Sequence, residues 1–295
     1  MNNDFLRKYL FIENSNKVGK KYYHNTIDKY QLKFYNPLDE YRINYIISTS
    51  GFFSKVYDIT QLNTNKNYVL KMSEPGDVTP LTEIKILSMI ESNYIVKLVD
   101  CYYFNEKYYL ILEKASGGNL YDYLQLYQLD EIQGKRLIKQ IVVGMMELHK
   151  NNIIIKDIKA ENILVKDNNI NSNILLSDFN LSIIVNNKDK YTNDRGGTLQ
   201  YASPEVLTFH NYYSFKTDIW SLGVLIYYLL IGDLPFNDKN DELIMKNIRD
   251  VKYHKPDKWN KLSIEAKDLI ENILILDVNQ RYSLTDIWYH KWFTK

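Results

Sequence analysis

Two kinds of hydrophobic periodicity divide this chain, and their order is the feature that most restricts its fold. Between Tyr41 and Leu112, apolar residues alternate or form short runs separated by polar turns, which is typical of β-strands. From Ile132 to Lys150, apolar residues recur at the spacing of one helix face. Helical patterns return at three later places: Lys216–Ile231, Ser263–Leu276 and Leu284–Trp292. Strands followed by helices predict an α+β protein, with a small antiparallel sheet and a larger, mainly helical part.

Shorter patterns refine this division. Residues 84–90 predict one short helix inside the strand-rich part. Three apolar runs after the long helix predict short strands: Ile153–Ile155, Ile163–Val165 and Ile174–Leu176. Gly117-Gly118 is a candidate hinge, and residues 1–40 lack a clean period. We therefore expect an extension over residues 1–40, a sheet lobe over 41–114 and a helical lobe over 115–295.

Composition excludes several classes of protein. The 37 basic and 36 acidic residues give a formal net charge of +1, which argues against a nucleic-acid or anionic-membrane binder. Cys101 is the single cysteine, so an internal disulfide is excluded and an intracellular, cytoplasmic location is expected. The apolar run Ile219–Gly232 is shorter than the roughly 20 residues of a membrane span, so it predicts a buried core helix.

The strongest chemical signal is the run Ile155–Leu164, in which Asp157, Lys159 and Asn162 stand between two apolar strands. A loop in this position can bring a carboxylate, an ammonium group and an amide to one point. Phosphoryl transfer uses such a set, because it needs an acceptor for a hydroxyl proton, a cation near the phosphate and oxygen ligands for magnesium. Taken alone, the run could also be a solvated loop without a chemical role.

This run resembles the catalytic loop of eukaryotic-type protein kinases, whose pattern is H-R-D-L-K-x-x-N. Further along, Asp178-Phe179-Asn180 resembles the kinase D-F-G motif, with Asn180 in the place of a glycine; asparagine tolerates a positive φ better than most residues. Gly197–Glu205 resembles the G-T-x-x-Y-x-A-P-E end of the activation segment. Asp218–Gly223 resembles the start of the helix that supports the catalytic loop. The motifs stand in the order that the family has.

The strand-rich part carries weaker matches. Tyr68-Val69-Leu70-Lys71 resembles V-A-I-K, with Glu83 as the helix partner of Lys71. Without the other motifs, Lys71 and Glu83 would be interpreted as two surface charges. Thr49–Val56 resembles the glycine-rich loop, in which only Gly51 keeps its glycine.

The resemblance implies a bilobal kinase fold that uses ATP and Mg²⁺ and phosphorylates serine or threonine side chains of proteins. It implies catalytic roles for Asp157 and Lys159, and magnesium binding by Asn162 and Asp178. ATP binding is implied for the following residues: Gly51, Val56, Lys71, Glu83, Glu113, Ala115 and Leu164. The resemblance also implies that Glu205 pairs with Arg281, and that Asp218 accepts hydrogen bonds from the backbone of the catalytic loop.

Two details indicate which kinases of this family the chain resembles. Lys159 and the pair Gly197-Thr198 resemble serine/threonine rather than tyrosine kinases. Gly232–Phe236 resembles the calmodulin-dependent and AMP-activated group. Lys156 stands where the family has an arginine that grips a phosphorylated activation segment, and we expect an attraction between Lys156 and Asp194 instead.

Two other functions compete with protein phosphorylation. A pseudokinase, which uses the same fold as a binding scaffold, is suggested by the degraded glycine-rich loop and by three substitutions: Val69, Ile155 and Asn180 stand where the family has alanine, histidine and glycine. A small-molecule kinase of related fold is disfavoured by Thr198–Glu205, a peptide-binding feature. The sequence predicts neither the protein substrate nor the oligomeric state.

Overall fold

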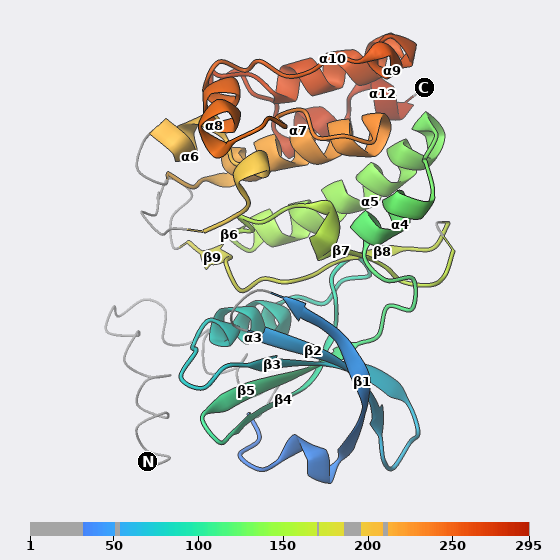
Figure 1. The fold of residues 1–295 in the computed structure, drawn as a ribbon, viewed down its shortest axis with the longest axis vertical. Coiled ribbons are helices and arrows are strands. Elements are labelled where there is room, and N and C mark those ends of the chain that lie inside the picture. Colours follow the sequence, from blue (N-terminus) through green and yellow to red (C-terminus); the bar gives the residue numbers. More distant parts are fainter. Residues whose placement is uncertain (1–31, 51–53, 170, 186–195, 209–211, 295) are drawn as a thin grey trace. The chain divides into compact units, whose positions relative to one another are not determined.

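The computed structural model describes residues 32–50, 54–169, 171–185, 196–208 and 212–294 (Figure 1). The chain divides into two compact units. The first contains the chain up to Asp77 together with Leu98–Ile111, and the second contains Val78–Lys97 and the chain from Leu112 onward. The lobe boundaries after residues 40 and 114 stay a prediction. Among the described helices, none has both the length and the apolar character that crossing a bilayer requires.

A five-stranded sheet dominates the first unit, in the spatial order β1-β2-β3-β5-β4. The strands are β1 (Tyr41–Ser50), β2 (Ser54–Gln61), β3 (Asn67–Ser73), β4 (Leu98–Phe104) and β5 (Lys107–Glu113). Strand β2 pairs antiparallel with both β1 and β3. Asn105 and Glu106 join β4 to β5 with φ angles of 49° and 62°, and positive φ at both central residues suits the twist of a two-residue hairpin. The predicted antiparallel sheet is confirmed.

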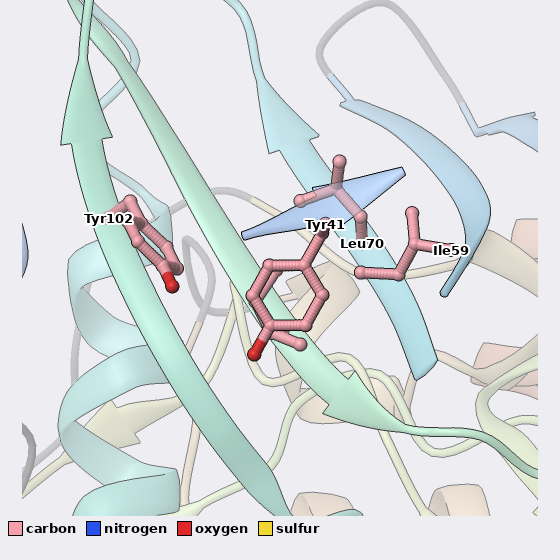
Figure 2. Packing of buried hydrophobic residues seen from close by; sticks show 5 residues of the cluster. Tyr41, Ile59, Leu70 and Tyr102 are labelled. Carbon is pink, nitrogen blue, oxygen red and sulfur yellow. The ribbon is translucent and has the colours of Figure 1, made fainter. Parts of the chain in front are cut away.

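The sheet of the first unit has its own apolar core. Tyr41, Ile59, Leu70, Tyr102 and Ile111 form this core, and Figure 2 shows Tyr41, Ile59 and Leu70 close together beside Tyr102. The rings of Tyr41 and Tyr102 meet edge to face, with their centroids 6.4 Å apart. The five side chains come from all five strands, so every strand of the sheet contributes to this core.

Residues 32–40 are the described part of the predicted extension, and they bind to the outer strand of this sheet. The Lys33 amide donates to the Cys101 carbonyl at 3.0 Å, and the Tyr103 amide donates to the Lys33 carbonyl at 2.8 Å. The Lys33 ammonium lies 3.2 Å from Glu40 and 3.1 Å from Asp100. A 3-10 helix, η1 (Pro37–Asp39), then leads into β1.

The second unit is mainly helical. Its α-helices are α3 (Pro80–Met89), α4 (Leu120–Leu126), α5 (Glu131–Lys150), α6 (Pro204–Thr208), α7 (Phe215–Ile231), α8 (Asp241–Arg249), α9 (Asp257–Lys261), α10 (Ile264–Ile273), α11 (Leu284–Trp288) and α12 (Lys291–Thr294). Two 3-10 helices accompany them, η2 (Ala160–Asn162) and η3 (Leu199–Tyr201). Two short antiparallel pairs complete the unit: β6 (Ile153–Ile154) with β9 (Ile183–Ile184), and β7 (Ile163–Val165) with β8 (Ile174–Leu176).

Helix α7 forms the core of this unit and contacts both α5 and α10 (Figure 1). All its residues from Thr217 to Ile231 are buried, which confirms the buried core helix predicted from the apolar run. Ser214 and Thr217 form a capping box at its start, and Gly232, with φ of 90°, ends it in the left-handed conformation. Helix α5 buries one stripe, because its apolar residues recur with helical period; the stripe includes Leu137, Ile141, Met145 and Leu148.

Candidate active site

The predicted catalytic loop follows β6 and is hydrogen-bonded to a side chain in the first turn of α7. Asp218 is fully buried, and its carboxylate accepts the amide hydrogens of Ile155 at 2.8 Å and Lys156 at 2.9 Å. The His149 ring lies 2.8 Å from the same carboxylate. Lys156 has a φ of 69°, which is the left-handed conformation. The backbone adopts this conformation at the point where the amides of Ile155 and Lys156 both donate to Asp218. The supporting role predicted for Asp218 is confirmed.

Asp157 stands at the centre of a compact polar network. Its Oδ2 atom lies 2.7 Å from the Lys159 ammonium and accepts a hydrogen bond of 2.9 Å from the Asn162 amide nitrogen. Its Oδ1 atom accepts a 2.8 Å hydrogen bond from the Thr198 hydroxyl, which in turn accepts one of 2.8 Å from Lys159. Asp157 and Asn162 are buried, so these charge-assisted bonds are made largely out of water. The structure thus brings Asp157, Lys159 and Asn162 together, as the sequence predicts.

Thr198 is a site residue that sequence reasoning missed as a ligand of Asp157. It lies just before η3, far along the chain from the catalytic loop. The only sequence signal was its place in the Gly197-Thr198 motif, which did not indicate what its hydroxyl contacts. Next to this network, burial and the nearby Glu161 carboxylate raise the pKa of the Tyr201 hydroxyl, so that hydroxyl stays protonated.

Asn162 and Asp178 occupy the same end of the β7–β8 pair. Ile163 of β7 lies opposite Leu176 of β8. Asn162 directly precedes β7 and Ser177 directly follows β8. The Ser177 amide and hydroxyl both donate to the backbone carbonyl of Asn162, each at 2.9 Å. Asp178 follows directly. This antiparallel register explains why two residues from different motifs come to one edge.

The backbone of the D-F-G-like motif differs from the expectation. The positive φ, 62°, belongs to Asp178, and Asn180 is not among the described residues with positive φ. The interpretation of Asn180 as a substitute for a left-handed glycine is therefore wrong. A carboxylate residue tolerates this conformation better than most, because a short polar side chain can bond locally. The side-chain oxygen of Asn180 is instead buried, without a hydrogen-bond partner among the described residues.

Glu83 lies in the first turn of α3 and is fully buried. Its Oε1 atom accepts a hydrogen bond from the Phe179 amide at 3.3 Å, so α3 contacts the D-F-G-like motif directly. A carboxylate in the first turn also interacts favourably with the helix dipole. The predicted pairing of Glu83 with Lys71 stays a prediction.

Two candidate ATP-binding residues lie in the sheet of the first unit. Lys71 on β3 is 8% exposed and lies opposite Val56 of β2. Burial of an amine is costly without a counter-charge, so a lysine at this depth is unlike an ordinary surface lysine. Gly51 lies outside the described residues, as does Asp194, the predicted partner of Lys156.

The segment after β5 pairs with β7, and the hinge predicted at Gly117-Gly118 stays a prediction. The Glu113 amide donates to Lys97 at 2.9 Å, the Gly117 amide donates to Val165 at 3.1 Å, and Leu164 forms a bridge with Asn119. A Cβ atom on Gly117 would lie 2.4 Å from the Asp167 carbonyl oxygen, so only glycine permits this approach. Glu113, Ala115 and Leu164, three predicted ATP-binding residues, thus belong to connected segments of the second unit.

Comparison with known proteins fits this geometry. A family model described as "Protein kinase domain" matches residues 49–293. The chain belongs to the protein kinase family. It is 33% identical over 301 residues to "Calcium-dependent protein kinase 4" of Plasmodium berghei (strain Anka), a match that covers 99% of this chain and 53% of the relative. It is 32% identical over 288 residues to "Probable serine/threonine-protein kinase fhkE" of Dictyostelium discoideum, covering 92% of this chain and 40% of the relative.

This kinase domain therefore spans about half the length of the curated relatives it matches, and its relatives include kinases named as serine/threonine kinases and as calcium-dependent kinases. The similarity confirms the predicted relation to the calmodulin-dependent group. It also accounts for the order of the motifs, because the matched region contains every motif from Thr49 to Arg281.

The kinase domain also contains the predicted buried ion pair behind the activation segment. Arg281 is 1% exposed and donates two parallel hydrogen bonds to Glu205, at 2.7 and 3.0 Å. Its guanidinium group donates further bonds to the carbonyls of Lys216 at 2.8 Å and Ile275 at 3.1 Å. The pair thus joins α6 to α7 and to the segment before α11.

Proposed function

We propose that this protein is a serine/threonine protein kinase, which transfers the γ-phosphate of ATP to serine and threonine hydroxyls of protein substrates. The observation that carries the proposal is the set of three donors around the Asp157 carboxylate: Lys159, Thr198 and Asn162. Family membership makes ATP and a protein the expected substrates, and the site supplies the chemistry.

The hydrogen bonds of Asp157 suit a residue that binds and orients a hydroxyl. A carboxylate has roughly four lone-pair positions, and three of them are used by Lys159, Thr198 and Asn162. One position remains for a further donor, which in this proposal is the substrate hydroxyl. The three donors also fix the carboxylate's orientation before substrate binds, which lowers the entropic part of the barrier.

Lys159 has a second task in this proposal. Its ammonium lies 2.7 Å from Asp157 and 2.8 Å from the Thr198 hydroxyl, so it can neutralise charge on a phosphoryl group transferred next to Asp157. The Thr198 hydroxyl bonds to both side chains, so in this proposal it fixes the position of Lys159 relative to Asp157. The contact joins the catalytic loop to the segment before η3. The proposed serine/threonine specificity rests on the motif resemblance of Lys159 and Gly197-Thr198.

The donor set at the end of β7 and β8 fits magnesium. The side-chain nitrogen of Asn162 donates to Asp157, so the side-chain oxygen of Asn162 is the atom that we assign to a metal ion. Asp178 adds a carboxylate at the same end of the strand pair, and both are hard oxygen ligands of the kind that Mg²⁺ prefers. When bound, the ion would neutralise charge on the phosphates. We propose Asn162 and Asp178 as its ligands.

For ATP itself we propose the residues that the family resemblance implies. Lys71, with Glu83, would bind the phosphates, while Gly51, Val56 and Leu164 would enclose the nucleotide. The backbone of Glu113 and Ala115 would bind adenine. Since the Glu113 amide already donates to Lys97, its carbonyl is the group we assign to the base. A cytoplasmic location is proposed from the single cysteine.

The test is a phosphorylation assay with γ-labelled ATP, magnesium and a generic protein substrate. Wild type is compared with Asp157→Asn and Lys71→Met, and with Asp257→Asn as a matched control on the exposed surface of α9. We expect wild type and the control to label serine and threonine equally. Asp157→Asn should lose at least about 100-fold in rate, the usual size of a general-base contribution.

Each other result has a clear meaning. Equal labelling by all four proteins would indicate a contaminating kinase and would favour the scaffold alternative. Label on tyrosine alone would refute the assignment of Lys159 and Thr198 to serine/threonine specificity. Activity that persists in Asp157→Asn but is lost in Lys71→Met would refute the role of Asp157.

A further inference from the structure

Tyr213, just before α7, contacts the two segments that meet at the proposed active site. Its hydroxyl donates a hydrogen bond to the carbonyl of Gly196. The face of its ring lies 4.3 Å from the Lys156 ammonium, measured to the ring centroid. Lys156 directly precedes Asp157, and Gly196 lies two residues before Thr198. Tyr213 therefore bridges the neighbours of two residues whose side chains bond to each other.

The segment that Tyr213 contacts needs an external restraint. Gly196 and Gly197 have φ angles of 152° and 99°, which residues with a side chain rarely adopt. Two successive glycines lose much conformational freedom when they are held in one state. Thr198 follows them and must present its hydroxyl to Asp157 at 2.8 Å. A hydrogen bond to the Gly196 carbonyl fixes the chain at the start of this flexible stretch.

Tyr213 is itself rigidly placed. It is 5% exposed and belongs to an apolar cluster with Ile154, Val185 and Val206. These neighbours come from β6, from the residue after β9 and from α6. The ring position is therefore determined by packing, and the hydroxyl and the ring face act from a fixed point.

The contact with Lys156 adds a second restraint. Lys156 is 5% exposed, and a cation on an aromatic face is attracted more strongly when it is removed from water. The backbone amide of Lys156 is held by Asp218. Its side chain, placed over Tyr213, completes the fixation of the residue next to Asp157.

We propose that Tyr213 is a positioning residue for phosphoryl transfer: it holds the Gly196–Thr198 segment against the catalytic loop so that Thr198 orients Asp157 and Lys159. The inference rests on the proposed kinase activity. It assigns to Tyr213 an effect on use of the protein substrate and none on the binding of ATP.

The experiment compares Tyr213→Phe with wild type and with Tyr227→Phe. Phenylalanine keeps the ring over Lys156 and its packing, and removes only the hydroxyl. Tyr227 is a matched control, because it is also buried and its hydroxyl also donates to a backbone carbonyl, that of His254. Both variants lose one such bond, but only Tyr213→Phe loses it next to Thr198.

Two measurements are made on each protein. Steady-state kinetics give kcat/KM for a peptide substrate and KM for ATP, and hydrogen–deuterium exchange gives the protection of the amides of residues 197–201. A net hydrogen bond corresponds to a change of about three- to tenfold. We expect Tyr213→Phe to lower peptide kcat/KM and to raise exchange by about that factor, with KM for ATP within about twofold of wild type. Tyr227→Phe should change neither.

The exchange measurement keeps the inference separate from the proposed activity. If wild type transfers no phosphate, the proposed activity fails, but faster exchange in Tyr213→Phe alone still supports the inference that Tyr213 fixes the Gly196–Thr198 segment, and unchanged exchange overturns it. In an active enzyme, unchanged exchange and unchanged kcat/KM overturn it as well. Equal effects in Tyr213→Phe and Tyr227→Phe would show a general loss of stability and would also overturn it.

Discussion

Removing either partner of the buried Glu205–Arg281 pair should destabilise this kinase domain, and loss of the arginine should cost more free energy of unfolding than loss of the glutamate charge. Arg281→Met leaves the Glu205 carboxylate buried and takes the guanidinium donors from the carbonyls of Lys216 and Ile275. Breaking a buried pair by removing one partner costs about 3–5 kcal/mol. We therefore expect Arg281→Met to lose about 3–5 kcal/mol in free energy of unfolding.

Glu205→Gln is the milder change. Arg281 keeps its two backbone carbonyls and its position 5.0 Å from the Trp220 ring, and glutamine can still accept one hydrogen bond. A lost bond to a charged group costs about 1.5–3 kcal/mol. The double variant should lose clearly less free energy of unfolding than the sum of the single variants, because Glu205→Gln removes the buried negative charge that Arg281→Met leaves unpaired.

Urea unfolding and calorimetry measure these differences. For a unit of 150–250 residues, 1 kcal/mol corresponds to about 2–4 °C in Tm, so Arg281→Met should lower Tm by about 6–20 °C. Arg249→Met on the exposed last turn of α8 is the control and should stay within about 0.5 kcal/mol of wild type. A cost below 1 kcal/mol for Arg281→Met, or strict additivity in the double variant, would refute the reasoning.

Three further predictions concern single sites. Asp218→Asn replaces one carboxylate oxygen by an NH2 donor, so one of the two backbone amides loses its acceptor and the other keeps only a neutral one; activity should fall about tenfold or more in the phosphorylation assay while the fold persists by circular dichroism. Gly117→Ala forces a Cβ against the Asp167 carbonyl and should lower stability by about 1–3 kcal/mol in urea. Burial raises the pKa of Cys101 to about 12, so the folded thiol should resist alkylation at pH 8, and its contribution to stability should decline above the ordinary thiol pKa of about 8.5.

Sequence periodicity located most elements because their burial pattern is regular. The strands Ile163–Val165 and Ile174–Leu176 were predicted with their observed bounds, and α5 begins one residue earlier than predicted. The helix predicted near Leu284–Trp292 begins at Leu284 as expected but is interrupted, since α11 ends at Trp288 and α12 begins at Lys291. There the His290 ring accepts the Trp292 amide and contacts Asp268 at 2.8 Å, so side-chain bonds replace the helical ones.

Helices with a small buried face were missed. Helix α8 buries only Ile244 and Ile248, and its other residues are polar or partly exposed. Its four apolar residues include three in a row, Leu243, Ile244 and Met245, and a run of that kind does not distinguish a short helix from a strand, although Asn240 caps the helix as an N-cap residue should. Helix α4 likewise buries only Leu120. The sequence contains the caps, but a cap beside so short an apolar pattern does not by itself predict a helix.

The site shows the same limit at the level of single atoms. The spacing of Asp157, Lys159 and Asn162 predicted which groups converge, because all three belong to one short loop. The orientation of the Asp157 carboxylate depends also on Thr198, and its loop depends on Asp218, which both come from distant segments. A motif therefore identifies the candidate carboxylate, while the direction of its side chain is set by tertiary contacts that a single sequence does not encode locally. If this is so, Thr198→Val, which removes the hydroxyl at nearly constant volume, should lower kcat more than it raises KM for ATP. Equal changes in both would place the contribution of Thr198 in nucleotide binding instead.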